Sequence, residues 1–165
     1  MDTIIVIITS ITLLAIISSV YLEIRRQAKP KIKVYFPNGS RLISYRAKEE
    51  ANVSIHIKNI GRFGLPKPVA TSLSVFVYTL PTFLMKEFKW VDQSTTYVKQ
   101  APSGGIFGGM YYMGGQITIS LFHKEEEVIT LAMQMPEKTG DYPVKVPISS
   151  DEGDLGIHEL RIIVT

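Results

Sequence analysis

The longest apolar stretch of the chain lies at its start. Residues 3–22 contain no charged side chain and only Thr, Ser and Tyr as polar types. A helix of this length rises about 30 Å, which is the hydrocarbon thickness of a bilayer. The hydroxyl groups can donate hydrogen bonds to carbonyls one turn back, so they oppose insertion only weakly. The pattern predicts a transmembrane helix over residues 1–24.

A cleaved signal peptide is the alternative interpretation of this helix. The apolar region of a signal peptide is usually about 7 to 15 residues long, follows a basic segment and precedes a small-residue cleavage site. Here the apolar run is longer, the acidic Asp2 precedes it, and residues 19–22 (SVYL) make a poor cleavage site. These differences favour an uncleaved anchor.

From residue 31 onward, apolar and polar positions alternate, as in strands with one buried face. In residues 52–60, for example, Val53, Ile55 and Ile57 would face inward and the intervening polar residues outward. Residues 71–80 alternate at first and then become apolar on both faces, which is typical of a central strand. We expect eight or nine strands, over residues 31–36, 52–60, 71–80, 84–91, 116–122, 128–135, 140–148 and 157–164, with shorter candidates at 41–45, beside the first strand, and at 95–99.

Residues 84–91 are the one ambiguous element of this set. Leu84, Phe88 and Trp90 share a strand face, whereas Leu84, Phe88 and Val91 would share a helix face. Aromatic and β-branched side chains favour the strand. Two prolines exclude residues 64–68 from any strand interior.

Short strands separated by turns, with no helix beyond the first, predict an all-β fold. We expect an immunoglobulin-like antiparallel β-sandwich of about eight or nine strands over residues 31–165, joined to the helix by a basic linker over residues 25–30. Tyr142 stands near the start of the penultimate strand. A tyrosine corner, whose hydroxyl binds the backbone a few residues upstream, is expected there, and an ordinary buried tyrosine is the alternative.

Residues 101–115 have an unusual composition, with six glycines interleaved with apolar and aromatic residues. The glycine doublets lack the spacing of a phosphate-binding loop, and no helix signal follows them. One interpretation is a partner-binding loop with adaptable Met and Tyr contacts. The other is a long hairpin loop folded back onto its own sheet. The partner-binding residues would be Phe107, Met110, Tyr111, Tyr112 and Met113.

The charge of the chain is concentrated directly after the predicted helix. The formal net charge is +3, and a basic cluster spans the linker and the first strand. The positive-inside rule alone would place the domain in the cytoplasm. Alternatively, the cluster anchors the chain at the interface by binding anionic headgroups. Its members are Arg25, Arg26, Lys29, Lys31 and Lys33. The rest of the domain is nearly neutral, so binding to nucleic acid is not expected.

Nothing in the sequence predicts catalysis, a cofactor or a metal site. The chain has no cysteine, and His56, His123 and His158 fall on separate predicted elements. No HExxH, GxSxG or P-loop motif occurs. Residues 125–127 (EEE) are expected to form a solvated turn, because neighbouring side chains of an extended segment point to opposite faces and do not converge on a metal. A non-enzymatic protein is therefore expected.

Two N-glycosylation sequons favour an extracytoplasmic domain instead. Asn38 begins the triplet Asn-Gly-Ser in a predicted turn, and Asn52 begins Asn-Val-Ser at a strand start. The chain contains only three asparagines, so two sequons exceed the chance expectation. Such sites are used on surfaces outside the cytoplasm.

The segments NVSIHIKNIG (52–61) and TGDYPVKV (139–146) carry a resemblance to known proteins. They resemble the strand ends of immunoglobulin-like modules in archaeal and bacterial surface proteins. A single span followed by one sandwich, without cysteine and rich in isoleucine, is similar to the archaellum (archaeal flagellum) stator proteins of the F/G type. The resemblance implies an anchor in the lipid bilayer whose sandwich binds partners in the cell envelope or a membrane complex. Sheet edges or residues 101–115 could also support a homodimer. A cytoplasmic adaptor of a membrane complex is the alternative.

Overall fold

The computed structural model describes residues 12–21, 30–61, 69–90, 103–107, 109–122 and 124–165 of the 165-residue chain. Residues 12–21 form a helix. Within the described ranges, no helix is long and apolar enough to cross a membrane. Of the predicted span over residues 3–22, only residues 12–21 are described. The predicted strand at 95–99 and the predicted loop at 64–68 lie outside the described residues.

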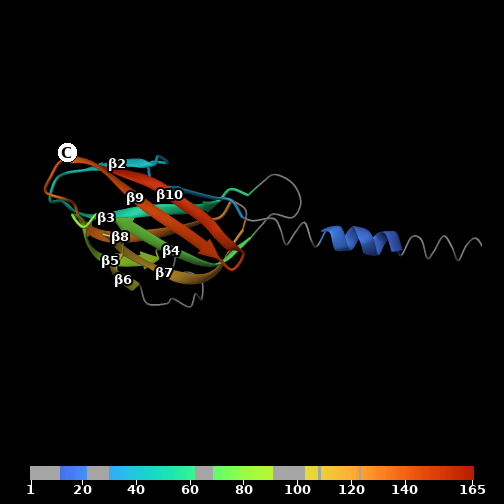
Figure 1. Ribbon diagram of the computed structural model, residues 1–165. Helices are drawn as coiled ribbons and strands as arrows, with labels where there is room; N and C mark the ends of the chain where they lie inside the picture. The colour runs from blue at the N-terminus through green and yellow to red at the C-terminus, as the bar shows by residue number, and fades with distance from the viewer. Residues whose placement is uncertain (1–11, 22–29, 62–68, 91–102, 108, 123) are drawn as a thin grey trace, which may run out of the picture.

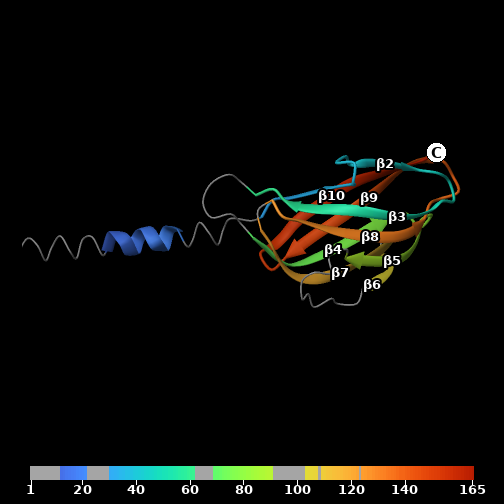
Figure 2. The ribbon, with the colours of Figure 1, turned by 180° about the vertical axis from the view of Figure 1, so that it is seen from behind.

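In the described residues, ten strands form two packed sheets, whose arrangement Figures 1 and 2 show. The four-stranded sheet has the order β1–β3–β8–β5, and the six-stranded sheet has the order β2–β10–β9–β4–β7–β6. The strand bounds are β1 Ile32–Tyr35, β2 Leu42–Tyr45, β3 Glu50–Asn59, β4 Ala70–Thr79, β5 Leu84–Trp90, β6 Ser103–Phe107, β7 Met110–Leu121, β8 Glu126–Gln134, β9 Gly140–Ser150 and β10 Gly153–Val164. The prediction of an all-β sandwich is confirmed.

The topology is that of an immunoglobulin domain with three added strands. In such domains the first, second, fifth and fourth strands form one sheet, and the third, sixth and seventh form the other. When β2, β6 and β7 are set aside, the seven remaining strands reproduce this arrangement. The hairpin β6–β7 is inserted between the fourth and fifth of these strands and extends the other sheet beyond β4. The end of β7 matches the strand predicted at 116–122, whereas β6 was not predicted.

Three details differ from the sequence-based predictions. The short strand at 41–45 does not pair beside the first strand, because β2 joins β10 in the other sheet. That pair is parallel, so the sandwich is not wholly antiparallel. The described part of the segment predicted at 84–91 forms a strand, β5, but a bulge between Met85 and Glu87 reverses the facing of its start. Leu84 is consequently 55% exposed, whereas Phe88 and Trp90 are buried as predicted.

The core lies between the two sheets and follows the predicted alternation. The strands that line it contribute every second residue, because successive side chains point to opposite faces. The predicted inward residues of the clearest strands are all buried, and these are Val53, Ile55 and Ile57 of β3, Tyr142, Val144, Val146 and Ile148 of β9, and Leu160, Ile162 and Val164 of β10.

The tyrosine corner is confirmed. The hydroxyl of Tyr142 donates a hydrogen bond to the carbonyl oxygen of Lys138, 2.6 Å away and four residues upstream. The Tyr142 ring packs edge-on against Phe83, with 5.3 Å between ring centroids. The hydrogen bond therefore fixes the loop that precedes β9 while the ring closes that end of the core.

Candidate functional site

The predicted partner-binding residues belong to a hairpin at the edge of the six-stranded sheet. Most of the segment expected to be a loop forms β6 and the start of β7, which pair in regular antiparallel register. The described residues therefore form a hairpin, as in the second interpretation, but they pair as strands rather than forming a long loop. Phe107 ends β6, and its side chain lies outside the described part of the structure.

Strand geometry divides the remaining predicted residues between two faces. Residues directly opposite each other on paired strands project to the same face. Tyr111 lies opposite the buried Thr79, and Met113 lies opposite the buried Val77. Both therefore point to the inner side, and Met113 packs against the core. Met110 and Tyr112 have the other parity and point outward.

Tyr112 belongs to a group of three aromatic side chains on the outer face of β4 and β7. Its ring stacks on that of Tyr78, with centroids 5.6 Å apart and planes 28° from parallel. The Phe76 ring meets Tyr112 edge-on at 6.2 Å. All three side chains are half-buried. We call Phe76, Tyr78 and Tyr112 the aromatic surface.

Sequence reasoning missed two of these three residues. Phe76 and Tyr78 occur in residues 71–80, whose apolar character on both faces was interpreted as that of a central strand. β4 is indeed central, but only its alternate residues, such as Val75 and Val77, are buried. The aromatic residues at the alternate positions 76 and 78 were the available signal.

Small and rigid residues flank Phe76 on both neighbouring strands. Gly114 lies opposite Phe76 on β7, and a Cβ atom placed there would lie 2.5 Å from the Phe76 ring and 2.3 Å from the Val75 carbonyl oxygen. Only glycine allows this close approach of ring and backbone. On the other side, the pairing of Val75 with Ile148 places Pro147 next to Phe76.

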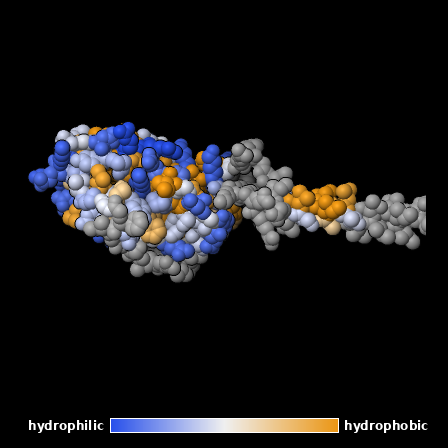
Figure 3. Space-filling view, in the orientation of Figure 1, coloured by the Kyte–Doolittle hydropathy of each residue, from blue (hydrophilic) through white to orange (hydrophobic). Residues whose placement is uncertain are grey.

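Apolar and charged residues continue this outer face toward β10. Pro147 lies opposite Ile157, which is 66% exposed. In Figure 3, apolar patches stand among hydrophilic areas on this side of the sandwich. Lys145 lies opposite both Tyr78 and Glu159, and Arg161 forms an ion pair with Asp141. An apolar centre with a charged rim is the usual anatomy of a protein interface.

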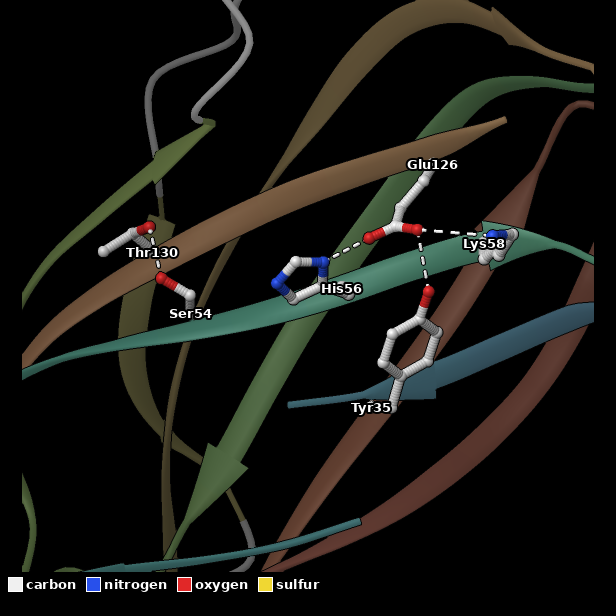
Figure 4. Close-up of polar contacts among 6 residues, drawn as sticks. All are labelled: Tyr35, Ser54, His56, Lys58, Glu126 and Thr130. Atoms are coloured by element: carbon white, nitrogen blue, oxygen red, sulfur yellow. Dashed lines mark hydrogen bonds and ion pairs between the residues drawn. The ribbon is translucent and has the colours of Figure 1, made fainter. Parts of the chain in front are cut away.

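The outer face of the four-stranded sheet is polar instead. Glu126 joins three strands there, because it accepts a hydrogen bond from the Tyr35 hydroxyl at 2.7 Å, a contact from His56 Nδ1 and an ion pair from Lys58 at 3.6 Å (Figure 4). The Tyr35 and His56 rings stack with centroids 5.5 Å apart. Farther along the same face, the hydroxyls of Ser54 and Thr130 share a hydrogen bond of 3.3 Å.

The contacts of Glu126 shift its own pKa and that of Tyr35. Burial disfavours the charged Glu126, but the hydrogen bonds from His56 and Tyr35 and the nearby positive charges outweigh it, so the pKa of Glu126 lies below its ordinary value. Burial, followed by the hydrogen bond and the charge of Glu126, raises the pKa of Tyr35 to about 12. A carboxylate saturated by donors in this way ties strands together and is poorly suited to act as a free base.

The acidic triplet at 125–127 is not a wholly solvated turn. Glu125 accepts a hydrogen bond from the backbone N–H of Phe122 at 2.8 Å and so closes the turn before β8. Because β8 begins at Glu126, the next two residues point to opposite faces, and Glu127 is buried. The prediction of a solvated turn is therefore correct for Glu125 and wrong for Glu126 and Glu127, which belong to β8.

The histidines do not come together in the described residues. His56 lies on the outer face of the four-stranded sheet, and His158 lies in β10 of the other sheet. Burial, aided by the charge of Arg41, lowers the pKa of His158, against a hydrogen bond to the backbone of Leu155. His123 falls outside the described residues. Within those ranges no three His, Asp or Glu side chains are grouped to hold a metal ion.

The remaining predicted sites lie at exposed positions or outside the described residues. Asn38 is exposed in the turn after β1, and Asn52 is exposed on β3. Of the basic cluster, Lys31 is exposed just before β1 and Lys33 is exposed within it, and the Lys33 ammonium lies 5.1 Å from the centroid of the Tyr35 ring. The other members, Arg25, Arg26 and Lys29, are not among the described residues.

Comparison with known proteins identifies the class of fold. No protein-family model and no curated protein sequence matches the chain. A cohesin module from a Clostridium perfringens family 33 glycoside hydrolase is similar over 84% of this chain and 98% of the module, with 7% identity and a TM-score of 0.51. The chain thus has the fold of cohesin-like, immunoglobulin-type β-sandwich modules.

Two further solved structures are similar at lower scores. A type III cohesin module from the cell-surface anchoring scaffoldin ScaE of Ruminococcus flavefaciens has 11% identity, covers 84% of this chain and 89% of its own, and has a TM-score of 0.47. AvmM, which catalyses macrocyclization in alchivemycin A biosynthesis, has 10% identity, with 82% and 89% covered and a TM-score of 0.49. At such identities the likeness concerns the fold alone.

Proposed function

We propose that this chain is a membrane-anchored, non-enzymatic scaffold protein whose β-sandwich binds a protein partner through the aromatic surface. The observation that carries this proposal is the exposed outer face of β4 and β7. Phe76, Tyr78 and Tyr112 stand there half-buried, and the exposed Ile157 lies farther along the same sheet. Aromatic residues without charge at the centre and charged residues at the rim are enriched in protein interfaces.

The ring geometry favours a protein over a flat ligand. The Tyr78 and Tyr112 rings stack, so one face of each ring is already covered by the other, and the Phe76 ring lies over Gly114. The groups left to a partner are ring edges and hydroxyls, which suit the mixed apolar and polar contacts of a protein surface. The partner would belong to the cell envelope or to a membrane complex.

Anchoring in the lipid bilayer is supported by the amino-acid sequence. Residues 3–22 are long and apolar enough for a span, and the basic cluster that follows suits an anionic lipid surface. The cluster residues Lys31 and Lys33 are exposed just before and within β1, which leaves them accessible to headgroups. A non-enzymatic role is supported by the separation of the histidines and by the saturated contacts of Glu126.

The sequons and the basic cluster support opposite sides of the membrane. The sequons favour an extracytoplasmic domain, which is the placement that we propose. The basic cluster favours the alternative, in which the domain faces the cytoplasm as an adaptor or accessory subunit of a membrane complex. An archaellum stator-like role is a narrower form of the first proposal, and pairing of two copies is compatible with either.

Partner binding is tested by changing the aromatic surface. Tyr78→Ser and Tyr112→Ser, combined, should abolish site-specific crosslinking between this face and its partner in native membranes, because the interface loses its central rings. Leu84→Ser is the control, since Leu84 is an exposed apolar residue on the other sheet. Crosslinking that survives the double variant, with thermal unfolding unchanged, would refute the proposed site.

Sidedness is tested separately with a single cysteine in this cysteine-free chain. Thr139 is exposed in the loop before β9, so Thr139→Cys should accept a reagent without disturbing the core. A membrane-impermeant maleimide should label it in intact cells if the domain is extracytoplasmic. Labelling only after lysis would favour the cytoplasmic adaptor.

A further inference from the structure

The two sequons have different structural roles, and the first is part of a strand-edge cap. The Asn38 side-chain amide donates a hydrogen bond to the carbonyl oxygen of Leu42 at 3.0 Å, and its oxygen accepts one from the N–H of Ser40. The Ser40 hydroxyl oxygen accepts a hydrogen bond from the N–H of Leu42 at 3.1 Å. β2 is an edge strand, so these contacts occupy backbone groups that would otherwise be open to another strand. The fold therefore accounts for Asn38 and Ser40 without a sugar.

Asn52 has no comparable structural role. It is exposed on β3, and its side chain makes no hydrogen bond to any described residue. Its neighbours Val53 and Ala51 face the core side, so Asn52 points away from the core, onto the outer face of the four-stranded sheet. A polar side chain without partners at this position is available for modification.

The surroundings of Asn52 leave room for a bulky group. The residue directly opposite on β8 is Ala132, whose side chain is a single methyl group. Asn52 and Ala132 line a groove of about 210 Å³, and an ion pair of 2.5 Å between Lys86 and Glu50 forms part of its wall. Charged side chains at the edge of such a groove can bind sugar hydroxyls. Sequon-linked sugars are bulky surface groups, so the fold must leave this kind of space.

We propose that Asn52, and not Asn38, is the N-glycosylation site of this protein. This inference rests on the proposed extracytoplasmic placement of the domain. The donor would be a lipid-linked oligosaccharide: a bond forms between the Asn52 amide nitrogen and the sugar C1, and the bond from C1 to the lipid phosphate oxygen breaks. The amide loses one proton, which balances the negative charge of the released lipid phosphate. The glycan would cover the polar face of the four-stranded sheet and leave the aromatic surface free for its partner.

The test measures the intact mass and the glycopeptides of the full chain purified from the source organism. The mass should exceed that of the polypeptide, with the glycan on the peptide that contains Asn52. Asn52→Gln and Ser54→Ala should abolish the added mass, whereas Asn38→Gln should retain it. Ser54→Thr is the matched control for Ser54→Ala, because it preserves the sequon and a hydroxyl for Thr130.

Labelling of Thr139→Cys in the same intact cells separates the two proposals. Labelling together with a glycan on Asn52 is the expected result. Labelling of cells whose protein carries no glycan, or carries it on Asn38 alone, overturns this inference and leaves the extracytoplasmic placement intact. Labelling only after lysis overturns the placement, and the glycosylation at Asn52 falls with it.

Discussion

The tyrosine corner provides the sharpest test of how this sandwich is held together. Tyr142→Phe removes one hydroxyl and with it the 2.6 Å hydrogen bond to Lys138. The ring remains, so its contact with Phe83 is preserved and no cavity forms. Lys138 is exposed, and water can therefore replace the lost donor at its carbonyl oxygen. The free energy of unfolding should fall by about 1 kcal/mol, the usual net value of such a bond.

Thermal and denaturant unfolding of the purified chain measure this effect. For a domain of this size, about 1 kcal/mol corresponds to a decrease in melting temperature of about 3–5 °C. Tyr45→Phe is the matched control, because the Tyr45 side chain also packs against the core but its hydroxyl donates no hydrogen bond to a described residue. Equal losses in both variants would show that the bond contributes nothing. A loss above about 3 kcal/mol would show that the corner supports more than one loop.

Two further predictions concern the sheets. Gly114→Ala should destabilise the domain by about 2 kcal/mol or more, because the added methyl would overlap the Phe76 ring and nearby backbone. Gly140→Ala should cost much less, since its Cβ would come no closer than 3.4 Å to the Tyr142 ring. Equal denaturation midpoints for the two variants would contradict this reasoning. The lowered pKa of Glu126 means that its contribution to stability is present above its ordinary value of 4.5 and is lost as the pH falls through the lowered value. Glu126→Gln should therefore be less stable than the original chain at pH 7 and approach its stability as the pH falls below 4.5. A difference in unfolding free energy that does not change with pH would refute the assignment.

Strand identity and strand facing could be predicted because both depend on local alternation. Val53, Ile55 and Ile57 alternate with polar residues, and only one face of such a strand can be buried without cost. The position of Tyr142 was also predictable from local sequence, because the turn residues before it mark the start of a strand. Departures occurred where a local irregularity reverses the facing, as the bulge after Met85 does for Leu84.

The candidate site was only partly predictable. Tyr112 stood out because aromatic residues among glycines are conspicuous, but Tyr111 and Met113 were grouped with it although they face the opposite side. Phe76 and Tyr78 were missed because their part of the strand is apolar on both faces. Which residues share a surface depends on which strands are neighbours, and a strand's own residues do not specify its neighbour.

The sequence by itself determined the apolar first helix, the two-sheet β class and the inward residues of most strands, since each depends on side-chain periodicity along one segment. Only the tertiary structure decided that the hairpin β6–β7 extends the sheet beside β4, that β2 pairs parallel with β10, and that Asn38 caps an edge while Asn52 stays unpartnered. These features arise from hydrogen bonds and ring contacts between segments far apart in the chain. Such long-range contacts exist only once the backbone has been brought together.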